Sequence, residues 1–113
     1  MTGTITWEPT KPKGDKNLVD SVPLLEAADN GEHFEVKCRY EQRKYRKPCI
    51  YTITIPKFGG LKKLAWSHEE VGGDQSGKIT DGHRTKTCNG YVVTGTWKED
   101  DKEWFMTIVL NYS

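Results

Sequence analysis

Residues 33–40 read HFEVKCRY and alternate strictly between apolar and polar side chains. The apolar members are spaced two residues apart: Phe34, Val36, Cys38 and Tyr40. Successive side chains of a β-strand point to opposite faces, so a period of two indicates a strand with one buried face. The stretch PCIYTITIP, residues 48–56, repeats the pattern between two prolines that are expected to bracket the strand. Both stretches are therefore predicted to be half-buried strands.

The C-terminal third continues the same architecture. HRTKTC and YVVTGTW are joined by Asn89-Gly90, a strong short-range signal for a β-hairpin. The last stretch, WFMTIVLNY at 104–112, is apolar on both faces, which predicts a central strand covered on both sides. With about six to eight short strands, the chain is expected to be all-β, an antiparallel β-sandwich or open barrel with little helix.

One domain spanning residues 1–113 is expected from the length of the chain. The proline- and glycine-containing residues 9–17 are expected to form a flexible loop or arm. Residues 18–28 stay open between helix and strand, because Pro23 would interrupt a helical stripe there. Residues 61–71 suit either a helical turn or an extended segment.

The net charge gives no reason to expect a polyanionic partner, because the chain has 17 Lys and Arg residues and 16 Asp and Glu residues. No apolar run approaches the ~20 residues that span a bilayer. The N-terminal residues lack the features of a signal peptide. We expect the mature form of a secreted or periplasmic protein with Met1 added, with a cytoplasmic protein as the alternative. Three cysteines, Cys38, Cys49 and Cys88, allow one disulfide with a free thiol, or three thiols.

The stretch VGGDQSGKIT, residues 71–80, contains most of a phosphate-binding loop. Such a loop needs Ser or Thr directly after its lysine and a helix behind it. Here Ile79 follows Lys78, and a hairpin signal follows in place of a helix. We therefore expect no nucleotide and no cofactor, and interpret residues 72–77 as a flexible glycine-rich loop between strands that can serve as a contact surface.

Metal and catalytic sites find little support in the spacing of residues. His68 with Glu69 and Glu70, and Asp81 and His83 before Cys88, lack the paired short spacing of a structural zinc site, so no metal is expected. A thiolate–imidazole pair of Cys88 and His83 would suit a small hydrolase, and this stays as a second alternative. The prediction is that the protein is not an enzyme.

The one stretch with distinct chemistry is RYEQRKYRKP at 39–48. It contains five cationic residues and a single acidic one, Glu41, and two tyrosines lie between the cationic residues. In a strand connection this composition is typical of a solvated loop, of a protein-binding surface, or of a site for phosphates and sulfates. Most of the four tryptophans are expected in the core, and any that is left exposed, with Trp7 next to the flexible arm as the candidate, would be a binding surface for a sugar ring or a partner.

The leading hypothesis is a non-enzymatic module that recognises another macromolecule, most often a protein, as a secreted effector, inhibitor or immunity-type protein would. The alternative is a polyanion binder for RNA, single-stranded DNA or sulfated glycan that uses residues 39–47. The expected partner-binding residues are Arg39, Arg43, Lys44, Tyr45, Arg46, Lys47, Gly72, Gly73, Gly77 and Lys78.

Overall fold

A computed structural model describes residues 1–11, 20–41, 48–70, 73–99 and 102–112. Over these ranges the chain consists of β-strands joined by turns, with no helix and hence none long and apolar enough to cross a membrane. The strands in chain order are β1 (Thr2–Lys11), β2 (Asp20–Pro23), β3 (Glu26–Asp29), β4 (His33–Glu41), β5 (Pro48–Pro56), β6 (Leu61–Glu70), β7 (Gly73–Lys86), β8 (Gly90–Glu99) and β9 (Lys102–Asn111).

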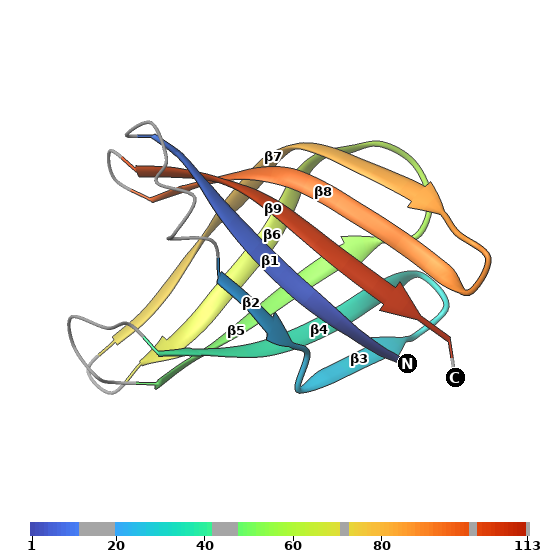
Figure 1. Cartoon of the computed structure of the whole chain (residues 1–113), viewed down its shortest axis with the longest axis horizontal. Coiled ribbons are helices and arrows are strands. Elements are labelled where there is room, and N and C mark those ends of the chain that lie inside the picture. The colour runs from blue at the N-terminus through green and yellow to red at the C-terminus, as the bar shows by residue number, and fades with distance from the viewer. Residues whose placement is uncertain (12–19, 42–47, 71–72, 100–101, 113) are drawn as a thin grey trace.

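The strands described form one antiparallel sheet in the order β2-β1-β9-β8-β7-β6-β5-β4-β3. β2 and β3 stand at opposite ends of this order, yet only Leu24 and Leu25 separate them in the chain. The Leu24 N–H donates to the Gly3 carbonyl on β1 (2.9 Å), and the Leu25 N–H donates to the Lys37 carbonyl on β4 (2.8 Å). The sheet therefore curls round and closes through this segment into a barrel (Figure 1). The expected all-β antiparallel fold is confirmed, in its barrel form.

Several local expectations are resolved by this topology. Residues 20–23 and 26–29 are strands, and β2 ends at Pro23, which has no N–H to extend a ladder. Residues 61–70 are a strand as well. The expected arm at 9–17 is wrong at its start, since 9–11 belong to β1 and pair with β9; residues 12–17 lie outside the described part.

The hairpin predicted at Asn89-Gly90 is confirmed, with its tip one residue earlier. The Thr87 N–H donates to the Gly90 carbonyl (2.9 Å), so Cys88 and Asn89 form the tip and Gly90 begins β8. In β7 the register shifts between Thr80 and His83, and Asp81 there has a positive φ of 53°. Such a bulge bends a strand and increases its twist, which helps the sheet to curl.

The alternation found in the sequence directs one face of β4 and β5 into the barrel, where Phe34, Val36 and Cys38 and then Tyr51, Ile53 and Ile55 are buried. Among the residues whose side chains are described, the inward ones gather into one buried apolar cluster. The buried apolar residues are Ile5, Trp7, Phe34, Val36, Cys38, Tyr51, Ile53, Ile55, Leu61, Ile79, Val93, Trp97, Met106, Ile108 and Leu110. Burial of each large side chain contributes roughly 1.5–3 kcal/mol before the entropy cost of ordering it, so this interior is the main source of stability.

Candidate functional site

The two ends of the barrel differ in which connections they carry. Because neighbouring strands in the sheet run antiparallel, one end of the barrel, called here the rim end, holds the strand ends at Lys11, Asp20, Glu41, Pro48, Glu70, Gly73, Glu99 and Lys102. The turns 30–32, 57–60 and 87–89 lie at the other end, the turn end, together with both termini (Figure 1). Any site built from strand connections therefore belongs to one end or the other.

The strands that flank the predicted basic segment lead to the rim end. Arg39 lies on β4, is exposed and pairs in register with Ile50. The ladder ends there with Glu41 opposite Pro48. The other members of the segment, Arg43, Lys44, Tyr45, Arg46 and Lys47, lie outside the described residues, as does Gly72.

The glycine-rich loop expected at 72–77 is wrong over most of its length. β7 begins at Gly73, and Gly77 and Lys78 are ladder residues opposite Trp66 and Ala65 of β6. The sequence prediction weighted the conformational freedom of glycine, whereas pairing with β6 holds this backbone in an extended form. The glycines thus extend the wall of the barrel, and the connection between β6 and β7 is confined to residues 71–72.

Three aromatic rings meet inside the barrel in the half nearer the rim end. Trp7, Tyr51 and Trp97 come from β1, β5 and β8. The ring centroids of Tyr51 and Trp97 are 5.3 Å apart, those of Trp7 and Trp97 are 6.0 Å apart, and those of Trp7 and Tyr51 are 6.4 Å apart. The pairs with Trp97 are edge-to-face, an arrangement that the quadrupole of aromatic rings favours. We call Trp7, Tyr51 and Trp97 the aromatic triad; their rings connect three separate strands across the barrel interior.

Trp7 is 8% exposed, so the expectation that it would be left on the surface is wrong. The signal that could have placed it inside was present in its own strand: Ile5 and Trp7 are two residues apart and share the inward face. The sequence prediction gave more weight to the neighbouring residues 9–17 than to this alternation.

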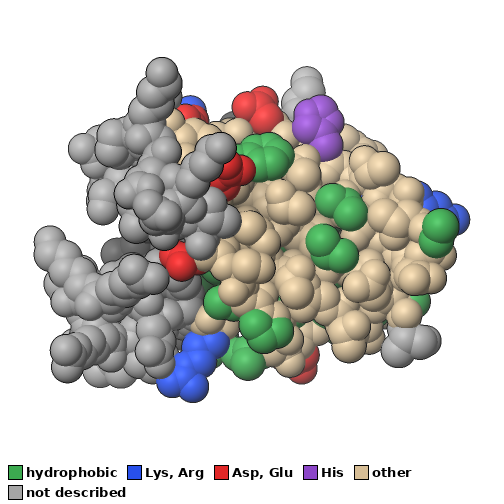
Figure 2. Space-filling model, viewed as in Figure 1, with side chains coloured by type: hydrophobic (Ala, Val, Ile, Leu, Met, Phe, Trp, Pro, Cys, Tyr) green, Lys and Arg blue, Asp and Glu red, His purple; other side chains and the backbone are tan. Residues whose placement is uncertain are grey.

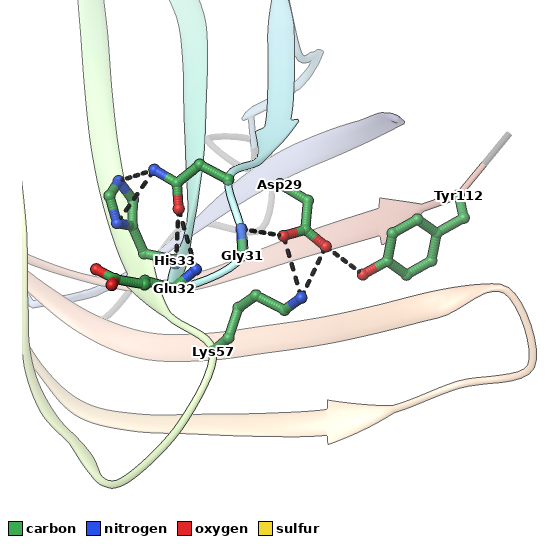
Figure 3. Close-up of polar contacts among 7 residues, drawn as sticks. Asp29, Gly31, Glu32, His33, Lys57 and Tyr112 are labelled. Carbon is green, nitrogen blue, oxygen red and sulfur yellow. Dashed lines mark hydrogen bonds and ion pairs between the residues drawn. The ribbon is translucent and has the colours of Figure 1, made fainter.

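At the turn end, a cluster of polar groups is centred on the Asp29 carboxylate, which sequence reasoning did not find (Figure 3). Lys57 Nζ donates to both carboxylate oxygens, at 3.0 Å to Oδ1 and 2.9 Å to Oδ2. The Tyr112 hydroxyl donates to Oδ2 (2.8 Å), and the Gly31 N–H donates to Oδ1 (2.9 Å). The hydrogen bond from Lys57, followed by those from Gly31 and Tyr112, lowers the pKa of Asp29 to about 2.

The pKa values of Lys57 and Tyr112, the side chains that donate to Asp29, are raised, whereas that of Asp29 is lowered. The hydrogen bond to Asp29 raises the pKa of Lys57, because it favours the charged ammonium. The same carboxylate raises the pKa of Tyr112, because it favours the protonated hydroxyl that donates to it. The cluster therefore keeps one arrangement of charges over the neutral pH range.

Aromatic rings and Arg84 support this cluster from the neighbouring strands. Lys57 Nζ lies 5.5 Å from the centroid of the Phe34 ring, within cation–π range. The Arg84 guanidinium donates to the carbonyl oxygens of Pro56 and Gly59 and so holds the β5–β6 turn. These contacts join β3, the β5–β6 turn, β7 and the end of β9, and so connect the exposed turns of this end to one another.

The two cysteines whose side chains are described lie in different environments. Cys38 is buried, and desolvation raises its pKa to about 12, so its thiolate is scarce at neutral pH. Cys88 is exposed at the tip of the β7–β8 hairpin, and His83 is exposed on β7. Both cysteines are free, so neither takes part in the disulfide that was one of the expectations. Within the described ranges no group of three or more His, Cys, Asp or Glu residues could hold a metal ion.

Comparisons of this chain with models of protein families, with curated proteins and with solved structures find no match.

Proposed function

We propose that this chain is a non-enzymatic binding module that recognises another macromolecule, a protein in the first instance, through its rim end. The observation that carries the proposal is topological. The antiparallel ladder β4–β5–β6–β7 brings the strand ends at Glu41 and Pro48 to the same end as those at Glu70 and Gly73. β5 and β6 are neighbours in the sheet, so the strand ends that border residues 42–47 and 71–72, at Pro48 and Glu70, lie on adjacent strands at the rim end.

The packing of the interior favours a partner at the rim over a small molecule in the bore. A ligand held inside a barrel of this size needs space that side chains do not fill. Here the aromatic triad occupies the interior near the rim end with its rings in mutual contact. A partner is then left with the rim itself, and the connections of a rigid scaffold are where binding residues concentrate.

The charges of the sequence at this end are polarised, which supports recognition of a protein. The β4–β5 connection carries Arg43, Lys44, Arg46 and Lys47, whereas the β8–β9 connection carries Asp100 and Asp101. Complementary patches of this kind steer association and reject wrong partners. Arginine and tyrosine are also the residue types enriched at the energetic centres of interfaces, which favours Arg43, Tyr45 and Arg46 as contacts.

A polyanion is the second candidate, favoured by the excess of cations around Tyr45. Counterion release makes polyanion affinity fall steeply with salt. Binding of a labelled single-stranded oligonucleotide and of heparin across a salt series tests this candidate. A steep slope that flattens when Arg43 and Arg46 are replaced by alanine would support the polyanion reading; a flat slope for the unaltered protein would exclude it.

The protein-partner reading is tested by affinity capture from an extract of the source organism with quantitative mass spectrometry. The test bait carries Arg43→Ala and Arg46→Ala. The matched control bait loses two cations away from the rim end, through Lys37→Ala and Lys86→Ala. The proposal predicts a partner that the unaltered and control baits retain and the test bait loses. Equal recovery on all three baits, or greater loss with the control, would contradict it.

A further inference from the structure

The chain contains two Asn-Gly sequences, Asn30-Gly31 and Asn89-Gly90, and both lie in turns at the turn end. Asparagine is one of the thermally labile residues. It is most labile before glycine, because glycine has no side chain to hinder the approach of its nitrogen to the asparagine amide. By sequence the two sites are equivalent, but the structure places them in different surroundings.

The side-chain amide of Asn30 is held at both its oxygen and its nitrogen, as Figure 3 shows. Asn30 Oδ1 accepts hydrogen bonds from the Glu32 N–H (3.2 Å) and the His33 N–H (2.9 Å). Asn30 Nδ2 lies 2.8 Å from Nε2 and 3.3 Å from Nδ1 of the His33 ring. The Gly31 N–H donates to Oδ1 of Asp29 (2.9 Å). Every group of this site that would have to react is therefore already bonded.

Asn89 lies at the tip of the β7–β8 hairpin and is exposed. Its main-chain carbonyl accepts a hydrogen bond from the Tyr112 N–H (2.7 Å). Among the residues that the structure describes, no group is hydrogen-bonded to the Asn89 side-chain amide, and no side chain accepts from the Gly90 N–H. Figure 2, drawn in the same view as Figure 1, shows the end where this hairpin lies (right) as outer surface of the molecule. The side chain of Asn89 can therefore turn without loss of a contact.

We propose that Asn89 is a site of spontaneous deamidation in the folded protein, and that the fold protects Asn30 from the same reaction. The Gly90 nitrogen attacks Cγ of Asn89 and forms the C–N bond of a succinimide ring. The side-chain nitrogen of Asn89 leaves as ammonia, which takes up the proton of the Gly90 N–H. One water molecule then opens the ring at either carbonyl and yields aspartate or isoaspartate, so water is the sole co-reactant.

The difference between the sites follows from what each reaction must break. The asparagine side chain has to turn toward the nitrogen of the next residue, and that nitrogen has to lose its proton. At Asn30 the turn breaks both hydrogen bonds to Oδ1, and the Asp29 carboxylate disfavours negative charge on the Gly31 nitrogen. Since loss of two hydrogen bonds suppresses the reactive arrangement by at least about tenfold, Asn89 should react at least about tenfold faster than Asn30.

The reaction has a structural consequence at the end of β9. In isoaspartate the main chain runs through Cβ and Cγ, so it is longer by one carbon atom. The carbonyl of Asn89 that accepts from the Tyr112 N–H is then no longer part of the peptide bond. Because the Tyr112 hydroxyl donates to Asp29 (2.8 Å), the modification loosens one of the contacts that hold the turn end.

Timed incubation of the full chain at neutral and mildly alkaline pH, followed by peptide mass spectrometry, tests the proposal. The control is the same chain unfolded in urea, where neither Asn-Gly sequence keeps its turn. The proposal predicts comparable rates at Asn30 and Asn89 in urea, and a rate at least about tenfold higher at Asn89 in the folded protein. Equal rates in the folded protein, a faster reaction at Asn30, or no reaction at Asn89 would overturn it.

The variant Asn89→Asp separates the effect of the added charge from that of the longer main chain. It carries the new carboxylate on a main chain of ordinary length, so it should keep the melting temperature of the unaltered protein. The isoaspartate fraction, isolated by ion exchange and identified by electron-transfer fragmentation, should melt at a lower temperature. Equal melting of this fraction and Asn89→Asp would overturn the stated consequence for Tyr112.

Discussion

Lys57, just beyond the end of β5, places its ammonium within hydrogen-bond distance of both carboxylate oxygens of Asp29, at the end of β3. The two residues are brought together by the ladder, because β3 and β5 both pair with β4. With the Tyr112 hydroxyl on the same carboxylate, this contact ties the C-terminal end of β9 to the β3–β4 turn. The turn end of the barrel is therefore held by charge-assisted hydrogen bonds, which are the stronger kind.

Replacement of Asp29 by Asn is expected to lower the melting temperature, because it removes the charge that Lys57 and Tyr112 face. The matched control is Glu26→Gln on the same strand, whose ion pair with Lys37 is longer (3.6 Å) and more exposed. Such an exposed pair contributes little. Thermal unfolding followed by circular dichroism should show a larger loss for Asp29→Asn; an equal or smaller loss would contradict the importance of the cluster.

The same contact predicts how stability depends on pH. The pKa of Asp29 in the folded protein is about 2, below its ordinary value of 3.8. Its contribution to folding stability is therefore fully present when the pH is above the ordinary pKa, and it is lost as the pH falls toward 2. The pKa of Lys57 is raised in the folded protein, so its contribution to folding stability is present when the pH is below its ordinary pKa of 10.5 and is lost at higher pH. The difference in melting temperature between the unaltered protein and Asp29→Asn should be largest between these limits. A difference that persists unchanged at pH 2 would count against the assignment.

Tyr112→Phe is expected to raise the pKa of Asp29, because the lost hydrogen bond had favoured the charged carboxylate. The carboxyl carbon shift of Asp29 in a pH titration by nuclear magnetic resonance measures this directly. The unaltered protein should titrate near 2 and the variant above it. A midpoint that does not move would mean that Tyr112 does not donate to Asp29 in solution.

In the aromatic triad, Trp97→Ala should lower the free energy of unfolding by about 3–5 kcal/mol, the usual cost of removing a buried large aromatic side chain. The matched surface change is Phe58→Ala: Phe58 is 74% exposed, and its replacement should cost within about 0.5 kcal/mol. Urea denaturation of both variants makes the comparison. Similar costs for the two would show that the triad is not packed as described.

The thiols should differ sharply in reactivity. In the folded protein Cys88 should react quickly with an alkylating reagent and Cys38 should not, since Cys38 is buried with a pKa raised to about 12. Peptide mass spectrometry after timed alkylation locates the label, and the same reaction in denaturant is the control. Because Cys38 and Cys88 are free, no pair is left for an internal disulfide among the 3 cysteines, and denatured, unreduced protein should titrate three thiols. A titration that finds one thiol, with the other two cysteines in a disulfide, would contradict this expectation.

The strands of this barrel could be predicted where side chains alternate. The periods at 33–40 and 48–56 correspond to β4 and β5, and the Asn89-Gly90 signal lies at the β7–β8 hairpin. Alternation reports directly on which side chains face the interior, and that is why it succeeded. It also predicted that both sides of β9 are covered; this is right for the inner side, where Met106, Ile108 and Leu110 are buried, and wrong for the outer side, where Phe105 is 43% exposed.

Other features could not be predicted, for physical reasons that differ. Gly73 and Gly77 have high conformational freedom of their own, and only the ladder with β6 holds them extended. Asp29, Lys57 and Tyr112 lie far apart in sequence, and no local pattern says that closure of the barrel will bring them together. The basic residues 43–47 were singled out by their chemistry alone, and binding through them stays a proposal.

Hydrogen–deuterium exchange of the protein, alone and with the partner recovered by affinity capture, tests the proposed binding end most directly. The proposal predicts added protection at the strand ends that border the rim end, at the amides of Glu41, Cys49, Glu70 and Gly73, with the turns at 30–32, 57–60 and 87–89 unchanged. Protection of those turns, with the rim end unchanged, would move the binding surface to the turn end and contradict the proposed function.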